Sequence, residues 1–304
     1  MFIITHRGFF FWLTGIILAA AIGAIVFLGL PLGIDFTGGS MMQVQYQNGV
    51  PPLASIEKQV AVVPLGVVHV RSSGTNAVSI RTRSMTTEEH SAVLDSLVGQ
   101  AISSNTSVTE LSYTSVGPSL GDQFGNKVLW AIFAVVLVIV LYIAFAFRKV
   151  SHLVPSWGYG LTVVAMLAID LIVPAGFYAA LCHFTGAQVD SLFIVALLSL
   201  LGYCVNDVIV IFDRIREHIA RNEKTGLKES FEDTIGKSIN ETMTRSINTS
   251  LTVVLALLAL IFLGAPATRD FALVMLVGVV AGTFSSICRS APLLIPISHW
   301  FTKK

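Results

Sequence analysis

Four ionisable side chains lie inside long apolar stretches of the sequence, where lipid rather than water is expected around the chain. They are Asp170, Asp207, Arg245 and Arg289. An ionisable residue in a transmembrane helix costs about 2.5 to 3.5 kcal/mol on insertion scales, so it normally faces a bundle interior and has a partner or a function. A carboxylate is the usual proton carrier in a transmembrane helix. Desolvation favours its neutral form and a nearby arginine favours its charged form, so the balance between the two forms can change. These residues therefore predict proton binding and release, centred on Asp207.

Asp207, which follows Asn206, and Arg245 are predicted to lie at a similar depth. Asp207 precedes Asp213 by six residues, about 9 Å of helix rise, so it lies in the cytoplasmic half of the membrane if Asp213 marks the boundary. Arg245 lies about 20 residues before the opposite end of its span, and its side chain can reach further in. An Asp207–Arg245 ion pair is therefore predicted. A proton switch and a fixed structural pair both remain open.

The helix that begins at Arg245 is polar along its inner half. Arg245, Asn248, Thr249 and Thr252 can lie on one face at helical spacing. Such a stripe either lines a hydrated path or packs against another helix, since hydroxyl side chains favour close helix contacts in membranes. For Asp170, proton handling and structural hydrogen bonding are both open. Arg289 is expected to extend toward the lipid head groups.

No motif for enzyme chemistry occurs in the sequence. It has no Walker A loop, HExxH pair, GxSxG elbow or Cys/His metal spacing, so no enzyme activity, cofactor or metal is expected. The three cysteines, Cys182, Cys204 and Cys288, lie in or beside apolar stretches and are interpreted as small apolar side chains. The 19 basic and 18 acidic residues give a formal charge of +1, so nucleic-acid binding is not expected.

Composition places the 304-residue chain among membrane proteins, because 54% of it is hydrophobic and 12% charged. Crossing the hydrocarbon takes roughly 20 helical residues. Six such spans can be identified: Phe9–Leu30, Val128–Phe147, Trp157–Leu181, Ser191–Phe212, Ile247–Leu263 and Phe271 to about Pro296. The first is too long for a signal peptide and no cleavage site follows it, which predicts a retained anchor.

Basic residues near the span ends predict that both termini of this inner-membrane-type protein are cytoplasmic. With this orientation, one side holds Arg7, Arg148, Lys149, the basic residues from Arg214 to Lys237, Lys303 and Lys304. The loop from Cys182 to Asp190 on the other side has no Lys or Arg. Residues 213–245 form a cytoplasmic connector with alternating charges, which predicts a solvated surface helix or a docking surface for a partner.

The region between the first two spans, residues 31–126, is predicted to form a separate extracytoplasmic domain. Strands are expected at Met41–Gln47, Val67–Arg71, Ala77–Arg83 and Ser107–Val116, and helices at Leu53–Val62 and Thr86–Ile102. Thr86 and Glu89 have the spacing of a capping box at the start of the second helix. The order β-α-β-β-α-β is that of a ferredoxin-like α+β domain. Residues 1–30 then form the first part of the chain, and residues 127–304 hold the remaining five spans.

Several motifs, in the same order along nearly the whole chain, resemble the SecD/SecF family of protein-export membrane proteins. They are Gly33–Gly39 (GIDFTGG), Val116-Gly117-Pro118, Asn206-Asp207 with Phe212–Glu217 (FDRIRE), Arg245-Ser246-Ile247 with Thr249-Ser250, and Ser285-Ser286 with Ala291–Leu294 (APLL). GIDFTGG is the most diagnostic. The family pattern often has His-Asp where this chain has Ile169-Asp170, so the resemblance implies no paired role for Asp170.

The resemblance implies one half of a transporter of the resistance-nodulation-division (RND) type. In that picture a SecF-like subunit pairs with SecD in the membrane, associates with the SecYEG channel, and uses the proton-motive force to promote late translocation and release of preproteins. Asp207 and Arg245 take the places of the family's proton-pathway residues. The coupling ion is a proton, and the other partners are membrane lipids.

The glycine-rich motif after the first span is expected to act as a hinge. Gly33, Gly38 and Gly39 permit backbone angles closed to other residues, which suits a tight passage from a membrane helix into a strand. A plain turn is the simpler explanation. The resemblance implies that this passage, with Asp35 and Phe36, transmits movement between the outer domain and the spans.

Two other functions remain open. A half-transporter for a lipid or small hydrophobic molecule would have a substrate pocket among the outer domain and the spans. A scaffold that only stabilises the translocase would use Asp207 and Arg245 as a structural pair. The family motifs favour the proton-driven subunit.

Overall fold

A computed structural model describes residues 2–73, 76–103, 106–146, 156–226 and 229–302. The chain divides into two compact units. One unit, termed the ferredoxin-like unit, comprises Pro31–Leu129 and the short segment Gly186–Ser191. The other, termed the helix bundle, comprises Met1–Leu30, Trp130–Thr185 and Leu192–Lys304. The sequence-based boundaries differ from this division chiefly because Gly186–Ser191, a loop between two spans, belongs with the ferredoxin-like unit.

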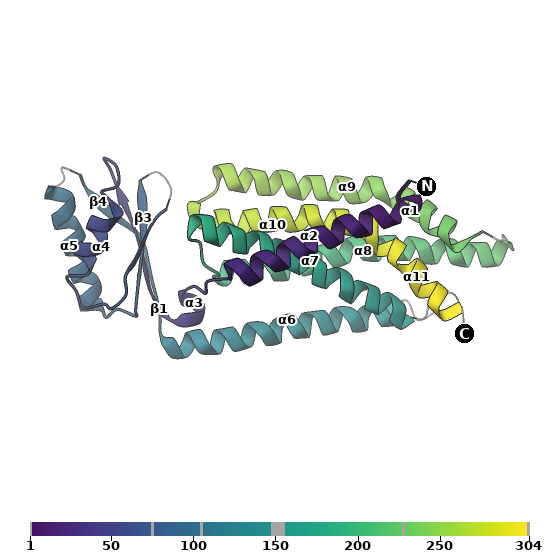
Figure 1. The fold of residues 1–304 in the computed structure, drawn as a ribbon, viewed down its shortest axis with the longest axis horizontal. Helices are drawn as coiled ribbons and strands as arrows, with labels where there is room; N and C mark the ends of the chain where they lie inside the picture. The colour runs from purple at the N-terminus through teal and green to yellow at the C-terminus, as the bar shows by residue number, and fades with distance from the viewer. Residues whose placement is uncertain (1, 74–75, 104–105, 147–155, 227–228, 303–304) are drawn as a thin grey trace. The chain divides into compact units, whose positions relative to one another are not determined.

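The ferredoxin-like unit has the predicted order of strands and helices. Its sheet consists of β1 (Gly39–Tyr46), β2 (His69–Ser72), β3 (Ala77–Thr82) and β4 (Val108–Val116), all antiparallel in the order β2-β3-β1-β4. Helices α4 (Leu53–Val60) and α5 (Thr87–Ser103) cover one face of the sheet (Figure 1). Alternating residues of β1, such as Met42, Val44 and Tyr46, are fully buried beneath these helices, which is the period-two pattern of a half-covered sheet.

The capping box predicted at the start of α5 is confirmed. The backbone N–H of Glu89 donates to Thr86 Oγ1 at 3.3 Å, and the backbone N–H of Thr86 donates to Glu89 Oε2 at 3.0 Å. Arg83 also donates to both carboxylate oxygens of Glu89, at 3.0 and 2.5 Å. These bonds lower the pKa of Glu89 below its ordinary value, with the Arg83 hydrogen bond as the largest cause.

Six helices in the described part of the chain are long and apolar enough to cross a membrane. Five are α2 (Arg7–Leu28), α6 (Pro118–Ala146), α7 (Ser156–Thr185), α8 (Ser191–Thr225) and α9 (Phe231–Leu263). The sixth runs through α10 (Pro266–Ser285), a π-helical turn η1 (Ser286–Ser290) and α11 (Ala291–Thr302). The short helix α1 (Phe2–Thr5) precedes α2.

The described residues of the polar connector form continuations of α8 and α9, so the predicted helical structure is confirmed. Pairs three residues apart, Arg214–Glu217 and Asp213–Arg216, stabilise the α8 extension. Arg214 and Glu241 link the two extensions. Five of the basic residues used to predict the orientation lie outside the described residues: Arg148, Lys149, Lys228, Lys303 and Lys304.

Glycines allow close approach of helices within the bundle. A Cβ on Gly176 of α7 would lie 2.5 Å from the Cα of Ala21 in α2, and one on Gly282 of α10 would lie 2.5 Å from Cys204 Sγ in α8. Small residues at such contacts are how membrane helices pack without a hydrophobic driving force. Cys204 thus fills space against Gly282, and all three cysteines are buried, as expected for small apolar side chains.

The sixth span is not a regular α-helix. Its π-turn lies just before Pro292, which has no N–H to donate to the carbonyl of Cys288, and the chain changes direction between α10 and α11 (Figure 1). A π-turn adds a residue to one turn and rotates the side chains that follow. All five of its residues, Ser286 to Ser290, are buried, so this turn determines which groups reach the bundle interior.

Candidate functional site

Asp207 of α8 is buried within the helix bundle, with 5% of its surface exposed. Ser286, the first residue of η1, donates a hydrogen bond from its Oγ to Asp207 Oδ2 at 2.8 Å. The structure has no ion pair to Asp207 among the described residues. A buried carboxylate whose partner is a neutral hydroxyl can be either charged or neutral without breaking an ion pair, which suits a proton-binding group.

The predicted Asp207–Arg245 ion pair is wrong for this structure, in which the described residues include no such pair. Arg245 is exposed on α9 and lines an open polar hollow of about 570 Å³ with residues of α8, among them Asp213 and Arg216. Ser246, the next residue, is turned into the bundle. Successive side chains on a helix point in directions about 100° apart, so the predicted depth of Arg245 in the membrane did not determine which side of α9 it lies on. Asn206 is likewise exposed, although Asp207 beside it is buried.

The polar stripe of α9 does lie on one face. Arg245, Asn248, Thr249 and Thr252 are all exposed, whereas Ser246 and Ser250 on the adjoining face are buried. Thr249 and Thr252 turn their hydroxyls back to carbonyls of their own helix, at 2.9 and 2.7 Å. Because these hydroxyls already donate hydrogen bonds within their own helix, this face of α9 can contact either water or another helix.

A buried charge pair joins Asp170 of α7 to Arg289 of η1, with 3.5 Å between Asp170 Oδ1 and Arg289 Nη2. The two residues are 2% and 5% exposed. The expectation that Arg289 extends to the head groups is therefore wrong, because the π-turn points it into the bundle. Ser285 and Cys204 lie beside the carboxylate. Neither oxygen of Asp170 has a hydrogen bond of ordinary geometry among the described residues, so the guanidinium is its main support.

Sequence reasoning missed a set of hydrogen-bonded hydroxyl groups that reaches the partner of Asp207. Tyr203 of α8 donates to Ser250 Oγ of α9 at 2.7 Å, and Ser250 Oγ lies 2.6 Å from Thr283 Oγ1 of α10. The backbone carbonyl of Thr283 accepts a hydrogen bond from Ser286 at 3.0 Å. Helices α8, α9 and α10 therefore contribute hydroxyls to a set of contacts that reaches Ser286, the hydrogen-bond partner of Asp207. The Ser285-Ser286 pair was the available signal in the sequence.

The glycine motif forms a junction of three chain segments within the ferredoxin-like unit. Gly33 donates its N–H to the carbonyl of Val189 at 2.7 Å, and Val189 donates to the carbonyl of Pro31 at 2.8 Å. Leu32 and Val189 form a parallel β-bridge. Helix α3 (Ile34–Thr37), which the sequence had not predicted, follows directly and ends at Gly38. The motif thus ties the segment before α8 to the segment after α2.

Three glycines are required where this junction meets the start of α6. Gly38 and Gly39 have φ values of 71° and 134°, which L side chains rarely adopt. A Cβ on Gly38 would lie 2.7 Å from Pro118 Cα, and one on Gly121 would lie 2.7 Å from the backbone nitrogen of Gly38. Phe36 packs against Phe124 of α6, with ring centroids 5.4 Å apart. The motif is a close-packed backbone crossing, rather than an open turn.

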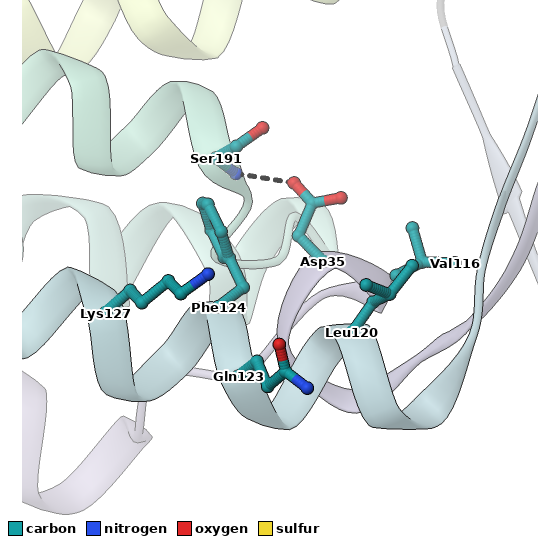
Figure 2. A pocket seen from close by; sticks show the side chains of 7 residues that line it. All are labelled: Asp35, Val116, Leu120, Gln123, Phe124, Lys127 and Ser191. Carbon is teal, nitrogen blue, oxygen red and sulfur yellow. Dashed lines mark hydrogen bonds between the residues drawn. The ribbon is translucent and has the colours of Figure 1, made fainter.

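Asp35 adds a side-chain hydrogen bond between two of the segments in this junction. Its Oδ2 accepts a hydrogen bond from the backbone N–H of Ser191, the first residue of α8, at 2.7 Å (Figure 2). This amide is one of the four at a helix start with no partner inside the helix. The carboxylate lies at the edge of a hollow of about 320 Å³, whose other lining residues include Gln123, Phe124 and Lys127 of α6.

Two family models match the chain. Residues 98–300 match the model described as protein export membrane protein SecD/SecF, C-terminal, and residues 23–50 match the SecD/SecF GG motif. The second match contains the GIDFTGG segment, and the first contains Asp170, Asp207, Arg245 and Arg289. Within the described residues, no three His, Cys, Asp or Glu side chains lie close enough together to hold a metal ion.

Similar proteins have the name protein translocase subunit SecF. One, from Thermobaculum terrenum, is 36% identical over 303 residues, which cover 96% of this chain and 92% of the relative. Another, from Sebaldella termitidis, is 35% identical over 292 residues, 95% of this chain and 89% of the relative. A third, from Anaerolinea thermophila, is 33% identical over 96% of this chain and 92% of its own length.

Among solved structures, the chain is similar to SecDF, described as a translocon-associated membrane protein, from Thermus thermophilus. The TM-score is 0.81 at 27% identity, covering 98% of this chain and 38% of that one. A second SecDF structure, in a super-membrane-facing form, gives a TM-score of 0.63 over 95% of this chain. The chain thus spans well under half of the solved SecDF chain. The described part of the chain contains six long apolar helices and a ferredoxin-like unit, and this multi-pass membrane protein belongs to the SecD/SecF family of protein-export membrane proteins.

Proposed function

We propose that this chain is the SecF-type subunit of a SecD–SecF complex, which uses the proton-motive force to promote late translocation and release of preproteins across the cytoplasmic membrane. The observation that carries the proposal is the burial of Asp207 beside a neutral hydroxyl, with no arginine paired to it among the described residues. Such a carboxylate can take up and release a proton when access to water changes. The proton is the coupling ion.

The partner that the complex requires is SecD. Asn206 and Arg245 are exposed, together with the polar face of α9, and a membrane helix does not leave this many polar groups toward lipid. We assign this face to SecD, so that the proton path runs along the contact and Arg245 acts when the two subunits are together. SecYEG and the translocating preprotein are the further partners.

Both termini are assigned to the cytoplasm. The start of α2 and the polar extension of α9 lie at the same end of the bundle, because Arg7 Nη1 pairs with Glu232 Oε1 at 2.8 Å. The positive-inside rule places the basic extensions in the cytoplasm, and Arg7 goes with them.

The test is preprotein export into inverted membrane vesicles that contain the SecD partner, with and without an imposed proton gradient. Asp207→Asn and Arg245→Met are compared with Asp213→Asn, a matched control on α8 that removes an exposed carboxylate. At equal complex yield, the first two variants lose the gradient-dependent part of export, and the control keeps it. Unchanged export in Asp207→Asn favours a scaffold that only stabilises the translocase.

A further inference from the structure

The hydroxyl of Ser286 has two hydrogen-bond acceptors and one proton. Its Oγ lies 2.8 Å from Asp207 Oδ2 and 3.0 Å from the backbone oxygen of Thr283. A serine hydroxyl donates one hydrogen bond and can accept others. Ser286 therefore donates either to the carboxylate or to the carbonyl, and it is 1% exposed, so bulk water does not compete for it.

We propose that Ser286 is the positioning residue that lets Asp207 hold both of its protonation states inside the bundle. When Asp207 is ionised, the Ser286 O–H points to the carboxylate. When Asp207 is protonated, its O–H donates to Ser286 Oγ, and the Ser286 O–H turns to the carbonyl of Thr283. One proton is taken up when the hydrogen bonds reverse in this direction and released when they reverse back, and the Asp207 carboxyl group and the Ser286 hydroxyl each keep a hydrogen bond in both states.

The π-turn makes this arrangement available. Ser286 begins η1, where the helix hydrogen bonds widen, and Ser290 at the other end donates to the carbonyl of Ser286 at 2.5 Å. This bond uses the backbone carbonyl of Ser286 and not its hydroxyl, so the turning of the Ser286 hydroxyl does not depend on it. Thr283, which receives the turned hydroxyl, is the residue that contacts Ser250 of α9. The protonation state of Asp207 is thus passed to a carbonyl of α10 beside the α9 contact.

Other charged or titratable groups near Asp207 are few in the described part of the bundle. Cys204 of α8 interacts electrostatically with both Asp207 and Asp170, and Asp170 of α7 is paired with Arg289 of η1, next to Cys288. Helix α9 contributes hydroxyls to the buried side, Ser246 and Ser250, and Arg245 is exposed. Ser286 is therefore the direct hydrogen-bond partner of Asp207, and the charged groups act from further away.

This inference rests on the proposed role of Asp207. Its test therefore measures the protonation of Asp207 directly and does not use preprotein export as the readout. Infrared spectroscopy of the full chain, co-purified with its SecD partner in lipid nanodiscs, follows the neutral carboxyl band of Asp207 against pH. The band is assigned by its loss in Asp207→Asn. Ser286→Ala removes the donor, and Ser290→Ala is the matched control, because Ser290 is in the same π-turn but bonds only to a carbonyl.

The expected result is a shift of the band's midpoint to higher pH in Ser286→Ala, by about one pH unit, a tenfold change in proton affinity. The direction follows because a hydrogen bond to the ionised carboxylate is stronger than one from its neutral form. Ser290→Ala keeps the parent midpoint. Ser286→Cys places a weaker hydrogen-bond donor of similar size at the same position, so it should also shift the midpoint to higher pH. This variant provides the test if Ser286→Ala does not fold.

An unchanged midpoint in Ser286→Ala, or an equal shift in Ser290→Ala, would overturn the inference. The outcome is separable from that of the proposed function. If gradient-dependent export survives in Asp207→Asn, Asp207 is not part of the coupling path and the proposed function fails. The infrared midpoints of the parent and Ser286→Ala still decide, independently, whether Ser286 controls the protonation of Asp207.

Discussion

Arg289 lies 3.5 Å from Asp170 in the interior of the helix bundle, and both side chains are almost completely buried. The pair is possible because the π-turn Ser286–Ser290 directs Arg289 inward. Two opposite charges in this environment stabilise each other, and each is costly to bury alone. The bundle therefore contains a fixed ion pair near Asp207, which is itself held by a hydroxyl.

Removing one member of this pair should destabilise the bundle. Asp170→Asn or Arg289→Met leaves the other charge buried without a partner, which costs about 3 to 5 kcal/mol. The double variant should cost less than the sum of the two, because no charge is left unpaired. Unfolding of the detergent-solubilised chain measures all three. Additive effects, or single variants as stable as the parent, would show that the two charges do not support each other.

The glycine junction gives a prediction about backbone geometry. Gly38→Ala combines a positive φ of 71° with a Cβ 2.7 Å from Pro118 Cα, whereas Gly66→Ala has a similar φ of 76° and no atom within 4 Å. Gly66→Ala should cost about 1 to 2 kcal/mol from the left-handed conformation alone. Gly38→Ala should cost clearly more, because the backbone crossing must also open. Equal unfolding temperatures for the two variants would argue against a close-packed junction.

Asp35 should act through its hydrogen bond to the first amide of α8. Asp35→Ala removes the acceptor for Ser191 N–H, with a cost of about 1 kcal/mol, typical of a lost helix cap. Asp35→Asn keeps a side-chain oxygen at the same place and should retain most of the stability. Hydrogen exchange at Ser191 is the direct measurement, and it should accelerate in Asp35→Ala only. Equal acceleration in Asp35→Asn would mean that the charge, rather than the cap, holds the junction.

The capping box of α5 predicts a pH dependence. The pKa of Glu89 is lowered in the folded chain by Arg83 and by the backbone of Thr86. A carboxylate with a lowered folded pKa contributes stability above its unfolded pKa, and this contribution is lost as the pH falls through the folded pKa. The parent should therefore unfold at a higher temperature than Glu89→Gln at neutral pH, and the difference should shrink below about pH 4. A difference independent of pH would remove Glu89 ionisation as the cause.

The features that the sequence predicted well depend on local patterns. The apolar runs, the alternating strands such as β1, and the Thr86–Glu89 box each lie within a short window, so their periods and spacings were sufficient. The facing of Arg245 and Arg289 was not predictable, because each depends on helix rotation relative to its neighbours. For Arg289 that rotation is set by a single π-turn, which has no clear signal apart from Pro292. The bond from Asp35 to Ser191 joins residues 156 positions apart, and no local pattern contains both.

The measurement that tests the central claim most directly is proton uptake by proteoliposomes that contain the chain and its SecD partner, after a proton gradient is imposed. A pH-sensitive dye inside the vesicles reports uptake for the parent, Asp207→Asn and the Asp213→Asn control. We predict that Asp207→Asn abolishes partner-dependent uptake and that Asp213→Asn retains it. Parent-like uptake by Asp207→Asn, at equal amounts of assembled complex, would contradict the account, because no proton could then be carried by the side chain at position 207.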